Sequence, residues 1–183
     1  MKITDIRITP VAVPVKPAKS ESKMRMGPRV LLEVMVEVFT DEGIVGIGES
    51  PCFLGNDLCT EILKSTRPAL IGKDPTNINR LLKELYVHYN LVHLHIHSAS
   101  WAFSGVEMAL WDILGKRANK PLYQVWGGAY RKRIEFMGGV ERQELDAMTR
   151  DAAQLAEAGY KVIYTKAGFD PEDDIAALAA MRK

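Results

Sequence analysis

The chain has 183 residues, 47% of them hydrophobic, which is enough to bury a core in one or two domains. Its 24 basic residues nearly balance its 23 acidic residues, so no electrostatic footprint for nucleic acid or an anionic membrane is present. No apolar run approaches membrane-spanning length, and no secretory leader pattern opens the chain. Cys52 and Cys59 are therefore expected to be free thiols in a cytoplasmic protein.

The first fifty residues predict an antiparallel sheet. Apolar and polar residues alternate over Ile3–Val13 and again over Arg29–Thr40, as they do in half-buried strands. Asp41-Glu42-Gly43 is typical of a tight turn, and Ile44–Glu49 is predicted to return as a third strand. One face of this three-stranded meander must be covered, and the helices that follow are the available cover.

The middle of the chain predicts a layer of three helices. Asp57 is expected to be the N-cap of a helix that ends near Leu70, and Asp74-Pro75 is expected to open the second helix. In the third helix, which starts near Ser98, small residues stand one turn ahead of larger apolar ones. Gly115, followed by Lys116 and Arg117, is predicted to form its C-terminal end.

The last part of the chain changes pattern. Pro121 is expected to open a short helical turn that two glycines, Gly127 and Gly128, close. Strands are then predicted at Ile134–Met137 and Lys161–Lys166, each followed by an amphipathic helix, and the two helices cover Glu144–Ala158 and Asp170–Arg182. This rhythm is typical of parallel βα units.

The third helix and the turn after it carry a resemblance to a known family. The signature of the mandelate racemase and muconate lactonizing enzyme branch of the enolase superfamily reads small-small-hydrophobic-acidic-x-Ala-Leu-x-Asp, then Gly-Lys, then Pro-Leu, then a terminal Gly. The matching residues here are Ser104, Gly105, Val106, Glu107, Ala109, Leu110, Asp112, Gly115, Lys116, Pro121, Leu122 and Gly127. The stretch from Ser98 to Gly128 therefore strongly resembles that signature.

The resemblance implies an α+β architecture in two parts. Residues 1–128 would form an enolase-like N-terminal capping domain, a three-stranded antiparallel meander plus helices. Residues 129–183 would form about two βα units, the start of a truncated (β/α)₈ barrel, because a full barrel needs ~200 residues or more. We therefore expect the N-terminal part of an enzyme.

The resemblance also implies a reaction and a base. Family members remove the proton alpha to a carboxylate with a Lys or His base, while Mg²⁺ stabilises the ene-diolate. A Lys-x-Lys motif follows their second barrel strand. Here that motif reads Tyr164-Thr165-Lys166, so Lys166 matches the catalytic lysine and Tyr164 replaces the first one. Because side chains alternate between the two faces of a strand, Tyr164 and Lys166 are expected to point the same way, into the barrel mouth. The alternative is that Lys166 simply extends from the strand end into solvent.

No metal ligand is predicted within the chain. The family supplies three acidic Mg²⁺ ligands from the third, fourth and fifth barrel strands, which lie beyond this sequence. Asp170, Asp173 and Asp174 open a helix and are expected to cap it and to compensate its dipole. The 183 residues alone are therefore expected to be inactive, whether the complete enzyme is a racemase or epimerase, a cycloisomerase or a dehydratase.

Two loops correspond to the capping-domain loops that govern substrate choice in the family. They cover Lys16–Pro28 and Pro51–Asn56. The candidate substrate-binding residues are Lys23, Met24, Arg25, Met26, Phe53 and Leu54. Basic groups suit a small carboxylate substrate, and the methionines and Phe53 suit an apolar portion, so a hydrophobic acid or an N-acylated amino acid fits slightly better than a polyhydroxy acid.

Two alternatives to an enzyme remain open. A partial barrel would expose apolar residues to solvent in a monomer, which predicts a homo-oligomer and allows a non-catalytic interaction module. Those residues are Val162, Ile163, Ile175, Leu178 and Met181. All four histidines, His88, His93, His95 and His97, also lie within ten residues, which would suit a small metal-binding protein.

Overall fold

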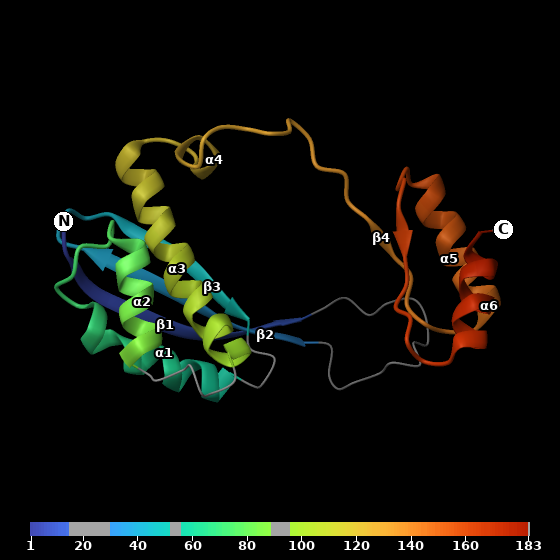
Figure 1. Ribbon diagram of the computed structural model, residues 1–183, viewed down its shortest axis with the longest axis horizontal. Helices are drawn as coiled ribbons and strands as arrows, with labels where there is room; N and C mark the ends of the chain where they lie inside the picture. Colours follow the sequence, from blue (N-terminus) through green and yellow to red (C-terminus); the bar gives the residue numbers. More distant parts are fainter. Residues whose placement is uncertain (15–29, 52–55, 89–95, 183) are drawn as a thin grey trace. The chain divides into compact units, whose positions relative to one another are not determined.

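The computed structural model describes residues 1–14, 30–51, 56–88 and 96–182. These residues fall into two compact units, of which the first ends at Ala129 and the second begins at Tyr130. Figure 1 shows the helices and strands of both units.

The first unit contains a three-stranded antiparallel sheet in the order β1–β2–β3. The strands are β1 (Ile3–Pro14), β2 (Val30–Thr40) and β3 (Val45–Pro51). The predicted meander is therefore confirmed, with a turn at residues 41–43. Alternation along β2 buries Val34, Val36 and Val38, whereas Val30 and Leu32 near its start are exposed.

Three longer helices follow the strands in this unit: the first and third pack on the sheet, and the second packs against the other two (Figure 1). They are α1 (Asn56–Leu70), α2 (Ile78–His88) and α3 (Ile96–Ala118), and the short α4 (Leu122–Val125) follows α3. One core joins the sheet to the helices. Its buried members are Ile3, Ile6, Val34, Val36, Val38, Cys59, Leu63, Leu70, Ile78, Leu81, Leu85, Ala102, Phe103, Val106, Ala109, Leu110 and Ile113. None of the helices among the described residues is long and apolar enough to cross a membrane.

The predicted starts of the first two helices are wrong. Asp57 lies inside the first turn of α1 rather than ahead of it. The second helix begins at Ile78, because the Asp74 carboxylate closes a turn instead: it accepts hydrogen bonds from the backbone N–H of Thr76 at 2.9 Å and from its hydroxyl at 2.8 Å. The same two bonds hold the pKa of Asp74 below its usual range.

The third helix, α3, ends at Ala118, so Gly115, Lys116 and Arg117 lie at its C-terminal end as predicted. A Cβ atom at Gly115 would lie 3.1 Å from the carbonyl oxygen of Lys120, so the glycine leaves room for the chain to fold back against the helix. Asn119 follows with φ +49°, a left-handed conformation of the kind that ends helices. The short turn is confirmed: Pro121 precedes α4, and Gly127 follows it with positive φ.

The second unit contains two strands and two helices. β4 (Gly138–Gly139) pairs in parallel with β5 (Ile163–Tyr164), and α5 (Leu145–Glu157) connects them. The last helix is α6 (Pro171–Met181). The alternation of strands and helices therefore matches the prediction for a parallel βα arrangement.

The position of the first of these strands differs from the prediction. Ile134–Met137 does not form a strand, and Ile134 and Phe136 are exposed. Pairing falls on Gly138 and Gly139 instead. α5 lies close to the first of them: a Cβ atom at Gly138 would be 3.0 Å from a methyl carbon of Leu155.

A small core holds the second unit together. It comprises the buried residues Val140, Met148, Ala152 and Ala177, with Leu155, Ile163 and Met181 packed against them. The expectation that Ile163 and Met181 face solvent is therefore wrong. Val162, Ile175 and Leu178 are exposed.

Candidate active site

The signature residues of α3 bring this helix into close contact with β3. A Cβ atom at Gly48 would overlap the carbonyl oxygen of Gly105, and one at Gly46 would overlap that of Ala109. Ser50 adds hydrogen bonds: its hydroxyl donates to the carbonyl oxygen of Ala102 at 2.7 Å and accepts from the N–H of Gly105 at 3.2 Å. The small signature residues thus allow a helix backbone to lie directly against a strand.

Two charged signature residues bond to the outer edge of β3. The N–H of Ile47 donates to a carboxylate oxygen of Asp112 at 2.9 Å. The amine of Lys116 donates to the carbonyl oxygen of Val45 at 2.7 Å and to the same Asp112 oxygen at 2.6 Å. Asp112 and Lys116, which we call the edge cap, therefore satisfy backbone groups that an edge strand otherwise leaves open.

We expect Asp112→Ala to destabilise the protein by about 1–3 kcal/mol, because it leaves the N–H of Ile47 without its acceptor. Asp112→Asn keeps an acceptor oxygen and should recover part of that loss. Urea unfolding followed by circular dichroism measures both changes. Glu107→Ala, at the other acidic signature position and on an exposed part of the same helix, is the matched control and should change stability by less than about 0.5 kcal/mol.

In the second unit, Tyr164 and Lys166 lie at the carboxyl end of β5. Ile163 and Thr165 are partly buried, whereas Tyr164 and Lys166 are exposed, so exposed and covered side chains alternate here. The ring of Tyr164 lies beside β4: a Cβ atom at Gly139 would be 3.2 Å from a ring carbon. The hydroxyl of Thr165 is buried and has no hydrogen-bond partner among the described residues.

The loop that follows Lys166 turns sharply into α6. Gly168 has φ +100°, a conformation that side chains disfavour, and its N–H donates to a carboxylate oxygen of Asp174 at 2.6 Å. Asp170 caps α6 by accepting from the N–H groups of Glu172 at 2.9 Å and Asp173 at 3.2 Å. Asp170 and Asp174 thus hold the backbone near Lys166, and Asp170 caps the helix as predicted.

Both predicted substrate loops leave the sheet at one end. β1 ends at Pro14, opposite the start of β2 at Val30, and β3 ends at Pro51, opposite Glu33. The candidate residues Lys23, Met24, Arg25, Met26, Phe53 and Leu54 lie outside the described residues.

Glu33 is an acidic group at this end of the sheet. One of its carboxylate oxygens is buried without a hydrogen-bond partner among the described residues. Burial, and secondly the negative charge of Glu49, raise the pKa of Glu33 above its usual range. The carboxyl of Glu33 is therefore harder to ionise in the folded protein than in the unfolded chain. Its contribution to the free energy of unfolding becomes more unfavourable as the pH rises through the raised pKa.

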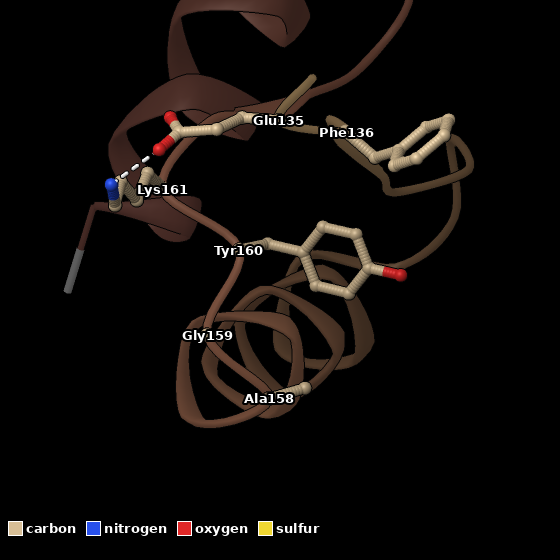
Figure 2. Close-up of a pocket in the computed structure, with 6 residues that line it drawn as sticks. All are labelled: Glu135, Phe136, Ala158, Gly159, Tyr160 and Lys161. Carbon is tan, nitrogen blue, oxygen red and sulfur yellow. Dashed lines mark hydrogen bonds and ion pairs between the residues drawn. The ribbon is translucent and has the colours of Figure 1, made fainter. Parts of the chain in front are cut away.

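A shallow hollow of about 290 Å³ lies at the opposite ends of β4 and β5. Its lining residues are Glu135, Phe136, Ala158, Gly159, Tyr160 and Lys161. Figure 2 shows the ion pair between Glu135 and Lys161, with the side chains of Phe136 and Tyr160 to one side of it. These residues precede the strands, whereas catalytic groups of (β/α)₈ barrels follow them, so the hollow is not the candidate active site.

The described residues hold no group of three or more His, Cys, Asp or Glu side chains that could bind a metal ion. His88 ends α2 and His97 lies in the first turn of α3, while His93 and His95 lie outside the described residues. The acidic residues near Lys166 are engaged with backbone N–H groups, as described for Asp170 and Asp174. The described part of the chain therefore does not fit a Mg²⁺ ion.

Comparison with known proteins decides the family. Residues 3–127 match the family model described as mandelate racemase / muconate lactonizing enzyme, N-terminal domain. The chain belongs to this family. Its matched residues run from the first residue of β1 to Gly127, so they include the whole signature and the edge cap.

Relatives of this mandelate racemase / muconate lactonizing enzyme family member include dehydratases and racemases. The chain is 29% identical to cis-3-hydroxy-L-proline dehydratase from Roseibium aggregatum, over all of its own length and 49% of the relative's. It resembles the crystal structure of N-succinyl Arg/Lys racemase from Bacillus cereus with a TM-score of 0.85 at 26% identity, covering 100% of this chain and 48% of that one. The chain thus spans about half the length of the relatives it matches.

A third relative carries a metal. The crystal structure of an enolase from Pseudomonas fluorescens Pf0-1 contains bound magnesium, potassium and tartrate. This chain matches it with a TM-score of 0.79 at 25% identity, over 99% of its own length and 49% of that chain. A solved structure similar to this protein therefore binds both Mg²⁺ and a small carboxylate.

Proposed function

We propose that these residues are the N-terminal part of a Mg²⁺-dependent enzyme that removes the proton alpha to a carboxylate. Residues 1–128 would be its capping domain and residues 129–183 the start of its barrel. The observation that carries the proposal is the position of Lys166, two residues past the end of the second strand of a parallel βαβ unit. Catalytic groups of (β/α)₈ barrels occupy this position.

Lys166 is the proposed base. It would take the alpha proton onto its amine, and its exposure at the strand end leaves that amine open to a bound substrate. Tyr164, exposed on the same strand, would donate a hydrogen bond from its phenol to the substrate or accept one from the Lys166 amine.

Substrate choice is proposed to lie in the two loops that leave the sheet together. Lys23 and Arg25 would pair with an acidic group, and Met24, Met26, Phe53 and Leu54 would contact an apolar portion. A hydrophobic acid or an N-acylated amino acid fits this set, and racemase or epimerase, cycloisomerase and dehydratase chemistry all begin with the same proton removal.

Mg²⁺ would stabilise the enolate form of the substrate, and its ligands are proposed to come from later barrel strands. No group of the described residues is suited to hold the ion. The contribution proposed for this chain is therefore the base, the phenol beside it and the substrate loops.

Association into a homo-oligomer is also proposed. Val162, just before β5, and Ile175 and Leu178 of α6 are exposed, and a large exposed apolar surface is rarely tolerated on a soluble monomer. Sedimentation velocity at several concentrations distinguishes an oligomer from a monomer.

The role of Lys166 is tested in a longer polypeptide, in which residues 1–183 are followed by the barrel strands that bind the metal ion. Exchange of the alpha proton for deuterium in ²H₂O, followed by NMR over a set of N-acylated amino acids and hydroxy acids, reports proton removal directly. We expect Lys166→Ala to slow this exchange ~10²–10⁴-fold, the usual contribution of a general base. Lys161→Ala, at the amino end of the same strand region, is the matched control and should leave the rate unchanged. Undiminished exchange in Lys166→Ala would reject the proposal.

A further inference from the structure

We propose that Arg142 is a positioning residue for Lys166. Arg142 lies three residues after β4, and it contacts the loop that connects Lys166 to α6. The inference rests on the proposed role of Lys166 as the base. It adds a residue of the neighbouring strand end to the machinery that orients that base.

The contact has three components, which we call the Arg142 clasp. The guanidinium forms an ion pair with Asp174 at 3.2 Å. It also lies over the ring of Phe169, 5.3 Å from the ring centroid, and donates to the carbonyl oxygen of Asp173 at 3.5 Å. One side chain thus touches three residues between the end of the β5 region and the first turn of α6.

The ion pair between Arg142 and Asp174 is far less exposed than the pair between Lys161 and Glu135. The side chains of Arg142 and Asp174 are only 13% and 16% exposed, whereas those of Lys161 and Glu135 are 73% and 66% exposed. Surface ion pairs contribute little to stability, but a shielded pair with additional contacts holds its partners in one geometry. Removing Arg142 would leave the Asp174 carboxylate shielded and without its cation.

Asp174 transmits this constraint to the base. One of its carboxylate oxygens faces Arg142, and the other accepts the N–H of Gly168 at 2.6 Å. Gly168 is two residues after Lys166 and has φ +100°, so the hydrogen bond fixes the backbone where the loop bends. Arg142 therefore acts on Lys166 through Asp174 and Gly168, and misplacing a base by about 1 Å can slow a reaction 10²-fold.

The clasp can be tested in the 183-residue chain without turnover. Hydrogen exchange measures protection of the Gly168 amide. Reductive ¹³C-methylation gives an NMR signal for the Lys166 amine, which the Lys166→Arg variant assigns. We expect Arg142→Met, which keeps the length but removes the charge, to speed Gly168 exchange at least ~10-fold and to shift the Lys166 signal. Arg142→Lys restores a cation beside Asp174 and should recover part of both effects.

Amides of Met148 and Ala152 in α5 report whether the core of the unit is intact. If Arg142→Met disturbs them, Asp174→Asn is the second variant, because it keeps an acceptor oxygen for Gly168 and removes only the charge that attracts Arg142. We expect it to shift the Lys166 signal in the same direction. An unchanged Lys166 signal in a variant whose core is intact overturns the proposal. That failure is distinct from failure of the proposed function, which is read from proton exchange of a substrate.

Discussion

Gly48→Ala is expected to destabilise the first unit by at least about 3 kcal/mol, a large part of the ~5–15 kcal/mol that stabilises a typical protein. The added Cβ would overlap the carbonyl oxygen of Gly105, an atom of the α3 backbone. A backbone cannot change rotamer to make room, so helix and strand must separate and core contacts must loosen. Urea unfolding followed by circular dichroism measures the loss.

Gly43→Ala is the matched control for this substitution. Gly43 lies in the turn between β2 and β3, and a Cβ atom there would meet nothing within 4 Å. Its φ of +78° still disfavours alanine, which costs about 1–2 kcal/mol. If Gly48→Ala were no more destabilising than Gly43→Ala, the close approach of α3 to β3 would not be the reason why position 48 requires glycine.

A polypeptide of residues 1–183 alone is expected to show no Mg²⁺-dependent racemisation, cycloisomerisation or dehydration. A base by itself cannot stabilise the negative charge that develops on a carboxylate substrate, and the described residues hold no acidic cluster for a metal ion. Polarimetry and NMR with N-acylated amino acids, hydroxy acids and sugar acids, with and without Mg²⁺, measure the activity.

N-succinyl Arg/Lys racemase from Bacillus cereus serves as the positive control for this assay, because it shares the fold over the full length of this chain. Lys166→Ala is the negative control. Turnover by the homogeneous 183-residue polypeptide that is lost in Lys166→Ala would contradict the prediction and would require a metal-independent way to stabilise the developing charge.

Local patterns predicted most of the first unit. A sheet that packs against helices is predicted by the alternation in β1 and β2 and by the small residues of α3. Both patterns are visible in the sequence because burial of one face requires them. Asp74 shows where local reasoning failed: an aspartate before proline can begin a helix or close a turn, and the side-chain bond to Thr76 selects the turn.

The second unit was predicted less well because its strands are short. Two paired residues per strand leave almost no alternation to detect, and the approach of Leu155 to Gly138 depends on packing that no local window contains. Lys166 is proposed as the base because a family motif and a strand end coincide. Arg142 was missed because its partner Asp174 lies a whole βα unit away, and no pattern in the sequence links an arginine after one strand to an aspartate after the next.

The edge cap has a consequence for how this unit can be divided. Asp112 and Lys116 occupy, from a helix, the place along β3 that a fourth strand would take in a wider sheet. A fragment cut before α3 would keep all three strands and lose both the cap and the backbone that covers Gly46 and Gly48. Such a fragment would expose the unpaired backbone groups of β3 and the uncovered Gly46 and Gly48. Strands of further copies could then pair with β3 and aggregate. Any piece of this unit that is moved to another protein must therefore include α3 as well as the three strands.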